Sequence, residues 1–434
     1  MGAMPPPERT SSGSPISSRR RLSCALTCGW LLACLAGACP YYFSGVLPTF
    51  TDALFESVSG FSCTGATLIE DIEGVDGPIV LWRSMTQWLG GMGIILFFVA
   101  VLPLLGFGGV ELFKAEVAGP QKDKITPRVR DTAKKLWLIY LSLTVLLFVL
   151  LLESGMGAFD GLNHALTTVS SGGFSSRNNG IASFDNAVLE FILAIFMLLA
   201  AVNFTLLYRF IVQRDYAVFS DTELTWYMGA LGVACLSASL MLYFGPAPSL
   251  QDALRYGFFS VASSISSTGF YSAPHISPPS FLQLLIVLLI VMGGMSGSTA
   301  GGVKCIRLVA ALKQLVKQLR QVVHPSAVMT IKANEQPIPE SIVNAIWGLI
   351  FLFFLVFSIA AGILTIEGYD LVTASSAAFA SLSNVGPSLS QLSPGASYAE
   401  FSLVSKLTLA ACMLLGRLEF FTVLVLLTPA YWRR

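Results

Sequence analysis

Residues 62–67 of the chain read SCTGAT, and three later segments repeat this kind of small-residue cluster around a glycine. The later clusters are SSGGF at 170–174, SSTGF at 266–270 and SNVGP at 383–387. The separations between successive glycines are 108, 96 and 117 positions (173 − 65, 269 − 173 and 386 − 269), for Gly65, Gly173, Gly269 and Gly386. A period of about one hundred residues that occurs four times indicates an internal repeat.

The composition indicates that these clusters belong to a membrane protein. Of the 434 residues, 54% are hydrophobic and 12% are charged, and the mean hydropathy is +0.71. Soluble domains carry about 25% charged residues. A membrane helix needs about 20 mainly apolar residues. The stretches near this length are Ser23–Val46, Trp82–Phe107, Lys135–Leu152, Ala187–Val212, Leu224–Phe244, Phe281–Leu319, Ile342–Ile366 and Phe401–Ala430.

Other chemistries find little support in the sequence. The net charge of +1 gives no electrostatic reason to expect nucleic acid as a partner. The eight cysteines lack the spacing of a zinc site or a disulfide framework. The histidines are scattered, and we expect His164 to be a packing residue rather than a metal ligand.

A short, half-apolar stretch precedes each cluster and is too short to span a membrane. An acid near the start of each stretch is placed to cap a helix and to meet its positive end: Asp52, Asp160, Asp252 and Asp370. The repeating unit is therefore long helix, short helix, glycine loop and long helix. These units predict a disordered cytoplasmic tail at 1–21 and repeats at 22–113, 114–219, 220–333 and 334–434.

Basic residues predict the orientation. Lys and Arg gather before the first long stretch, within Lys114–Lys135, within Lys304–Arg320 and at the C-terminus, whereas the alternate connections carry mostly acids. The positive-inside rule places the basic segments and both termini in the cytoplasm. We therefore expect a multi-pass protein of the plasma membrane, the inner membrane in a bacterium, that contacts membrane lipid.

Four glycine loops at membrane depth favour a cation pore. Irregular backbone is tolerated there only inside protein or beside water, and converging carbonyls can replace the hydration shell of an ion. The negative C-terminal ends of the short helices would also favour a cation. We predict an all-α membrane protein with one central pore and potassium-channel-like pseudo-fourfold symmetry. The alternative is four ordinary re-entrant hairpins. The expected filter residues are Cys63, Thr64, Gly65, Ser171, Gly172, Gly173, Ser267, Thr268, Gly269, Asn384, Val385 and Gly386.

A glycine-rich segment interrupts the apolar stretch of the third repeat. It lacks the pattern of a phosphate-binding loop, G-x-x-x-x-G-K-[ST]. We interpret it as an intramembrane plug below the filter, with a plain helix kink as the alternative. An arginine at the centre of a membrane helix costs about 2.5–3.5 kcal/mol, so we expect Arg417 to find backbone partners in this plug, or else to be a static anchor. The gate residues would be Gly293, Gly294, Ser296, Gly297, Ser298, Thr299, Gly301, Gly302 and Arg417.

Three segments resemble a known family. They are WRSMTQWLGGMGII at 82–95, GGMSGSTAGGVK at 293–304, and GRLE at 416–419 followed by LTPAYW at 427–432. They are similar to the Trk/Ktr/HKT potassium-transporter superfamily, closest to its bacterial TrkH membrane subunit. The resemblance runs from about Leu22 to the end of the chain. It implies potassium as the transported ion, with K⁺ preferred over Na⁺ because Gly65 is not serine.

The same resemblance implies a homodimer and a cytosolic nucleotide-binding regulatory subunit of the TrkA/KtrA type. The chain itself lacks a G-x-G-x-x-G fingerprint after a strand. Two departures stand out: TrkH-like chains usually carry two further helices before the first repeat, and Cys63 occupies a position where threonine is more usual.

Two competing functions lead to different expectations. A sodium- or proton-coupled secondary cation carrier would interrupt helices at corresponding places in two halves, whereas only one long stretch is visibly interrupted here. An intramembrane enzyme would need clustered ionisable groups, and Arg417 is nearly alone at its depth. We therefore expect no enzyme activity and favour the pore.

Overall fold

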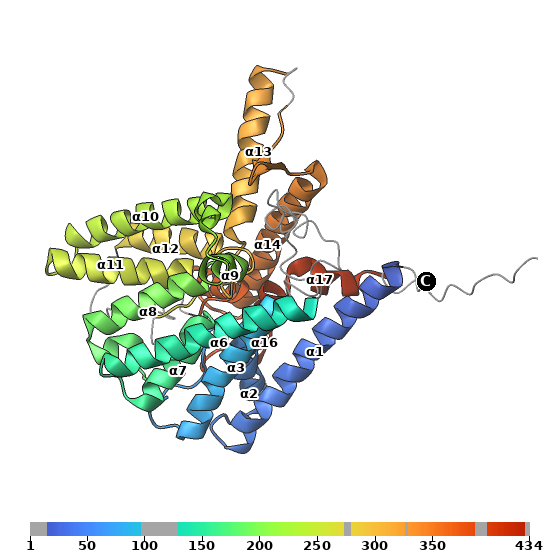
Figure 1. The fold of residues 1–434 in the computed structure, drawn as a ribbon. Helices are drawn as coiled ribbons and strands as arrows, with labels where there is room; N and C mark the ends of the chain where they lie inside the picture. The colour runs from blue at the N-terminus through green and yellow to red at the C-terminus, as the bar shows by residue number, and fades with distance from the viewer. Residues whose placement is uncertain (1–14, 97–128, 273–278, 326–328, 387–396, 430–434) are drawn as a thin grey trace, which may run out of the picture.

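The computed structural model describes residues 15–96, 129–272, 279–325, 329–386 and 397–429, and these residues are almost entirely helical (Figure 1). The exception is a short antiparallel pair, β1 (Lys332–Ala333) and β2 (Gln336–Pro337), in which Ala333 lies opposite Gln336. The chain is therefore an all-α protein, as predicted.

In the described residues, a long helix, a short helix and a further helix follow one another in this order four times. The first set is α1 (Pro15–Phe43), α2 (Phe50–Phe61) and α3 (Gly77–Leu96). The second is α6 (Val129–Glu153), α7 (Ala158–Val169), α8 (Ala187–Ala200) and α9 (Phe204–Ile211). The third is α10 (Thr222–Tyr243), α11 (Leu250–Ile265), α12 (Ser280–Met292) and α13 (Cys305–Val323). The fourth is α14 (Glu340–Ile366), α15 (Leu371–Leu382), α16 (Leu403–Leu418) and α17 (Phe420–Leu424).

Neighbouring sets pack through their short helices. Helix α3 packs against α7 of the next set, α8 packs against α11, and α16 of the last set packs against α2 of the first. The last set thus lies beside the first, and the four glycine loops that follow α2, α7, α11 and α15 occupy the interior.

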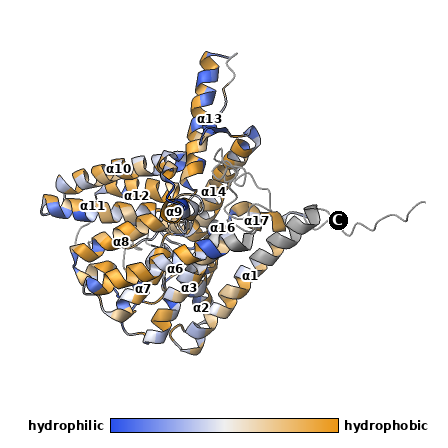
Figure 2. Ribbon diagram, viewed as in Figure 1, coloured by the Kyte–Doolittle hydropathy of each residue, from blue (hydrophilic) through white to orange (hydrophobic). Residues whose placement is uncertain are grey.

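The outer helices have the character of membrane spans. Three described helices are long and apolar enough to cross a bilayer: Thr132–Glu153, Thr222–Tyr243 and Glu340–Ile366. Large apolar side chains such as Leu138, Leu236 and Phe351 are exposed on them. Figure 2 shows apolar residues along α8, α10, α12 and α14, whereas polar residues gather on α13, which projects from the helical body. Exposed apolar walls of this kind are suited to lipid rather than to water.

Several predicted spans are interrupted where the sequence suggested continuity. The stretch 187–212 divides into α8 and α9, which are bent by 104°. The stretch 401–430 breaks at Glu419, whose φ is 66°. Together with the break between α12 and α13, the described residues show a broken helix after the glycine loop in three of the sets. The prediction of a single interrupted helix was therefore wrong.

The physical reason for the missed break lies at Asn203. Its side chain accepts a hydrogen bond from Thr205 N at 2.8 Å and caps α9. A single polar residue within an apolar run gave too weak a signal for a boundary.

At the start of the chain, α1 begins at Pro15, seven residues before the predicted start of the first repeat at position 22 (22 − 15). Residues 1–14, most of the basic segment Lys114–Lys135 and the final residues 430–434 lie outside the described residues.

Candidate functional site

The four glycine loops leave their short helices with the same backbone geometry. Each helix ends at a serine in the right-handed region: Ser62, Ser170, Ser266 and Ser383. The following residue has a left-handed φ in every loop: 56° for Cys63, 55° for Ser171, 58° for Ser267 and 53° for Asn384. Non-glycine residues seldom adopt this conformation, so its fourfold occurrence marks the loops as equivalent.

Backbone hydrogen bonds repeat as well. The amide after each left-handed residue donates to a carbonyl five positions back: Thr64 to Ser59 at 2.9 Å, Gly172 to Thr167 at 2.9 Å, Thr268 to Ser263 at 3.0 Å and Val385 to Ala380 at 2.9 Å. This closure resembles a Schellman motif. It turns each chain sharply at the C-terminal, partially negative end of its short helix.

The loops also meet one another. A Cβ on Gly65 would collide with the carbonyl oxygen of Gly172, and one on Gly173 with that of Thr268. A Cβ on Gly386 would likewise collide with the carbonyl group of Gly65. The φ of Gly65 is 83°, so this position needs glycine for both its conformation and its neighbours.

A narrow cavity of about 80 Å³ lies where the loops converge. The loop glycines of all four sets line it: Gly65, Gly173, Gly269 and Gly386. Residues more than three hundred positions apart therefore share one cavity.

The threonine hydroxyls of the first and third loops already have partners. Thr64 Oγ1 and Ser62 Oγ are 2.7 Å apart, and Thr268 Oγ1 and Ser266 Oγ are 2.8 Å apart. The Asn384 side chain donates to Thr64 Oγ1 at 3.1 Å, which joins the fourth loop to the first. These polar contacts hold the loops in place.

A buried polar network, which the sequence analysis did not single out, supports the first two loops. Gln87 Nε2 donates to Gly172 O at 2.7 Å, and Gln87 Oε1 accepts from Phe174 N at 3.1 Å. Arg83 and Glu56 form a fully buried ion pair at 2.9 Å. Glu56 also accepts from Leu68 N at 2.8 Å. A buried pair of charges is tolerated when its remaining hydrogen bonds are satisfied, as these are.

Only one of the four predicted acids is itself a helix cap. Asp370 accepts from Val372 N and Thr373 N at 3.1 and 3.0 Å and is the N-cap of α15. In α2 and α11 the caps are Thr49 and Ser249.

The remaining three acids lie in the first turn of their helices. Asp52 and Asp252 accept hydrogen bonds from these caps, at 2.7 Å each. Asp160 instead pairs with Arg177 at 2.6 Å. The capping prediction is therefore correct for Asp370 and wrong in detail for the other three.

Outside the helices, acidic residues join the connection between α2 and α3 to the connection between α7 and α8. The Asn178 side chain donates to Asp71 Oδ1 at 2.9 Å, and the backbone amide of Asn178 donates to Glu73 Oε1 at 3.2 Å. The Asn178 side chain and the Gly74 amide lower the pKa of Asp71 by hydrogen bonding to its carboxylate. This carboxylate is therefore ionised at neutral pH.

The segment between α12 and α13, residues 293–304, contacts the glycine loops directly. Thr299 Oγ1 is 2.9 Å from Ser171 Oγ in the second loop. Gly301 N donates to Ser267 Oγ in the third loop at 2.9 Å, and Gly302 N donates to Ser383 O in the fourth at 3.1 Å. We call residues 293–304 the intramembrane segment. It contacts three of the loops through side-chain and carbonyl oxygens at the positions where these loops turn.

The bend between α8 and α9 holds the other side of this segment. Met295 N donates to Ala201 O at 2.9 Å, and Phe204 N donates to Gly297 O at 3.2 Å. Two broken helices thus satisfy each other's backbone groups, which a lipid environment requires.

Glu223, in the first turn of α10, joins the intramembrane segment to the start of α13. Its Oε1 accepts from Ser296 N at 2.8 Å and from Ile306 N at 3.1 Å. The side chain is buried. An acid in the first turn of a helix commonly interacts with the helix dipole, so this second role of Glu223 could not be predicted from its position in the sequence.

Arg417 connects the intramembrane segment to the first loop. Its Nη1 donates to Thr299 O at 2.8 Å, the kind of contact that the sequence predicted. Its Nη2 lies 3.2 Å from both Gly90 O and Cys63 Sγ. The side chain is 4% exposed. Glu419 forms an ion pair with Arg307 at 2.9 Å. One guanidinium therefore joins the first loop, α3 and the intramembrane segment.

No cluster of metal ligands accompanies the loops. Within the described ranges, no group of three or more His, Cys, Asp or Glu side chains is arranged to hold a metal ion. His164 is fully buried and shares hydrogen bonds with Asp160 O and Ser175 Oγ at 2.8 and 3.0 Å, as expected of a packing residue.

Glycine loops buried among apolar helices define a helical membrane transport protein. Residues 2–232 and 243–434 match the model of the TrkH family, described as cation transport protein. The chain belongs to this family, which consists of transporters rather than enzymes.

Individual relatives agree with the family match. The chain is 39% identical over 410 residues to the Trk system potassium uptake protein TrkH of Halomonas elongata, covering 93% of this chain and 84% of the relative. It is 34% identical to TrkG of Escherichia coli K12, with the same coverage of 93% and 84%. The crystal structure of the potassium transporter TrkH from Vibrio parahaemolyticus superposes with a TM-score of 0.88 and 33% identity, covering 99% of this chain and 88% of that one.

Proposed function

We propose that this chain takes up potassium through a selective, gated pore whose filter is formed by the four glycine loops. The observation that carries the proposal is the shared cavity lined by Gly65, Gly173, Gly269 and Gly386. It is supported by the equivalent backbone turns of the four loops. The names of the relatives, all potassium uptake proteins, support potassium as the ion.

Backbone carbonyls would provide most of the coordination. The hydroxyls of Thr64 and Thr268 already take part in hydrogen bonds with neighbouring loop residues, so we expect carbonyl oxygens to be the main ligands. The ends of four short helices add partial negative charge near the cavity. Cys63 Sγ contacts Arg417 and Gln87 O, so replacing a hydroxyl by a thiol at this position leaves the carbonyl ligands in place.

Residues 293–302 would close the pore below the filter. This role is supported by the hydrogen bonds of Thr299, Gly301 and Gly302 to three loops and by the bond from Arg417 to Thr299 O. In this closed state Arg417 would hold the segment and add a positive barrier to cations. Withdrawal would require the segment to exchange these bonds for others.

A regulator would act through α13, which begins directly after the intramembrane segment. The helix projects from the body of the protein (Figure 1) and carries Lys313, Lys317 and Arg320. We propose a cytosolic nucleotide-binding subunit of the TrkA/KtrA type as this partner, and a homodimer with one pore per subunit. The protein would lie in a bacterial inner membrane, with both termini in the cytoplasm.

One observation favours the second candidate, a sodium- or proton-coupled carrier. Broken helices are typical of carriers, and breaks occur in three sets rather than in one. The breaks are not confined to corresponding places in two halves, however, and the equivalent loops occur in all four sets.

Flux into liposomes distinguishes the two functions. A pore passes potassium down its own gradient in the absence of a second ion gradient. A carrier needs sodium or protons in fixed stoichiometry. Potassium flux that stops when the sodium and proton gradients are removed would replace the pore by the carrier.

A further inference from the structure

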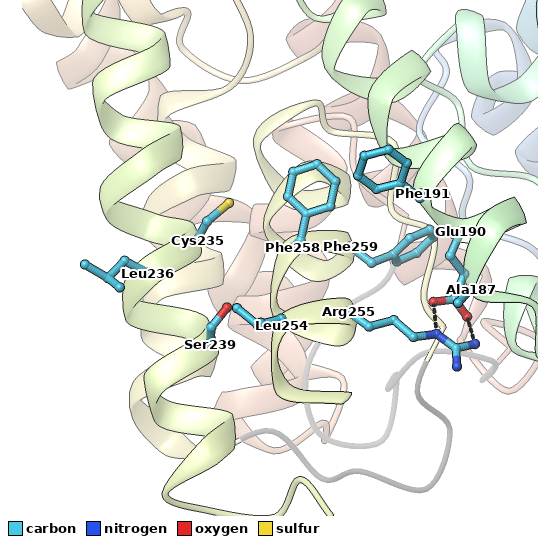
Figure 3. Close-up of a pocket in the computed structure, with 10 residues that line it drawn as sticks. All are labelled: Ala187, Glu190, Phe191, Cys235, Leu236, Ser239, Leu254, Arg255, Phe258 and Phe259. Atoms are coloured by element: carbon cyan, nitrogen blue, oxygen red, sulfur yellow. Dashed lines mark hydrogen bonds and ion pairs between the residues drawn. The ribbon is translucent and has the colours of Figure 1, made fainter. Parts of the chain in front are cut away.

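An apolar groove lies on the outer wall of the protein, away from the glycine loops. It has a volume of about 550 Å³ and is lined by α8, α10 and α11 (Figure 3). Phe259, which is 1% exposed, forms part of its inner surface. Phe191 and Leu254 are more than half exposed at its rim, so the groove opens outward.

The depth of the groove matches one leaflet of a bilayer. Cys235 lines the groove eight residues before the end of α10 at Tyr243 (243 − 235), or about 12 Å along the axis at 1.5 Å per residue. Arg255 and Glu190 lie at the other extreme, in the second turn of α11 and the first turn of α8. Half of a bilayer core measures about 15 Å, so a groove of this depth fits within one leaflet.

The polar end of the groove carries more negative than positive charge. Arg255 forms ion pairs with Glu190 at 2.8 Å and with Asp185 at 3.2 Å, and Asp252 lies one turn before Arg255 on α11. Two carboxylates therefore pair with one guanidinium at this end of the groove, which gives the three groups a net charge of −1. Asp185 is 86% exposed at its side chain and is available to a cationic group.

We infer that this groove binds a membrane phospholipid whose headgroup bears an ammonium, such as phosphatidylethanolamine. One acyl chain lies along Phe191, Cys235 and Phe258, and the ammonium lies near Asp185. An anionic lipid such as phosphatidylglycerol is disfavoured because its phosphate approaches a net negative cluster without a compensating ammonium. The inference needs the membrane fold alone and does not depend on ion selectivity.

A bound acyl chain would fill the space between the second and third sets of helices. Phe191 on α8 and Phe258 on α11 have ring centroids 5.8 Å apart within the groove. Helix α11 leads into the third glycine loop, and α8 leads to the bend that holds the intramembrane segment. This lipid would therefore stabilise the contact between α8 and α11.

Native mass spectrometry of the full chain tests the inference. The purified protein is stripped of lipid and mixed with phosphatidylethanolamine or phosphatidylglycerol, and the retained lipids are counted. Cys235→Phe fills the groove from α10, and Leu254→Trp fills it from α11. Leu240→Phe is the matched control, because Leu240 is exposed on the same helix but does not line the groove.

We expect the wild type and Leu240→Phe to retain one more phosphatidylethanolamine per chain than either filled variant. Asp185→Asn should lower the preference for phosphatidylethanolamine over phosphatidylglycerol by about two- to fivefold, as for loss of an exposed charge contact. Asparagine suits the left-handed φ of 37° at this position. Equal lipid retention by filled variants and wild type would overturn the inference, as would equal retention of both lipids by the wild type. Loss of dimer rather than of lipid in the filled variants would assign the groove to a second copy of the chain.

Discussion

Replacing Arg417 by alanine should raise basal potassium flux in the absence of any partner protein. Three contacts disappear: those with Thr299 O, Gly90 O and Cys63 Sγ. Only the bond to Thr299 O links Arg417 to the segment proposed to close the pore. The contacts with Gly90 and Cys63 join Arg417 to α3 and to the first loop, which would stay in place when the segment leaves. These two contacts therefore do not favour the closed pore over the open pore.

The size of the effect follows from this one bond. A hydrogen bond from a charged donor contributes about 1.5–3 kcal/mol net. Its loss shifts the ratio of open to closed pores by about 10- to 150-fold. The segment remains attached through Gly301, Gly302 and Glu223, so the gate is weakened rather than removed.

Passive rubidium uptake into liposomes measures the basal flux. Thr408→Ala controls for general damage to α16, because its hydroxyl bonds only within that helix. Arg417→Lys should give an intermediate flux, since lysine keeps the charge but lacks the fork that reaches several acceptors. Unchanged or lower flux in Arg417→Ala, with normal assembly, would refute the gate and leave Arg417 as a static anchor.

Three further predictions address the filter, the gate and the short helices. Gly65→Ser introduces about 1–3 kcal/mol of backbone strain and a collision with Gly172 O, so the ratio of K⁺ to Na⁺ flux should fall by at least about fivefold; an unchanged ratio would remove Gly65 from the filter. Glu223→Ala removes the one carboxylate oxygen, Oε1, that accepts from both Ser296 N and Ile306 N, which should raise basal flux by about fivefold or more; wild-type flux would limit Glu223 to a structural role. Asp370→Ala should destabilise the protein by about 0.5–2 kcal/mol, whereas Asp370→Asn should retain most of the stability because asparagine also caps; equal melting temperatures for both variants would contradict the cap.

The glycine loops could be predicted from the sequence because their signal is local and recurs four times. Cys63, Ser171, Ser267 and Asn384 each precede the loop glycine by two positions, and their common left-handed φ gives that spacing a structural meaning. The contact between Arg417 and Thr299 could also be predicted, because a buried guanidinium needs carbonyl partners and a broken helix supplies them.

Features that depend on tertiary contacts could not be predicted in the same way. The bend at Ala201–Asn203 is stabilised by hydrogen bonds to residues about ninety positions later, in an otherwise apolar run. Gln87 and the Arg83–Glu56 pair looked like ordinary polar residues of two helices until the fold placed them behind the second loop.

The central claim is that four loops form one potassium-selective filter, and ion competition tests it most directly. Liposomes that contain only this protein and are loaded with potassium take up tracer rubidium while K⁺, Na⁺ or Li⁺ is added outside. The account predicts that K⁺ competes with rubidium and that Na⁺ and Li⁺ compete weakly, with no requirement for a sodium or proton gradient. Equal competition by Na⁺ and K⁺ would contradict it.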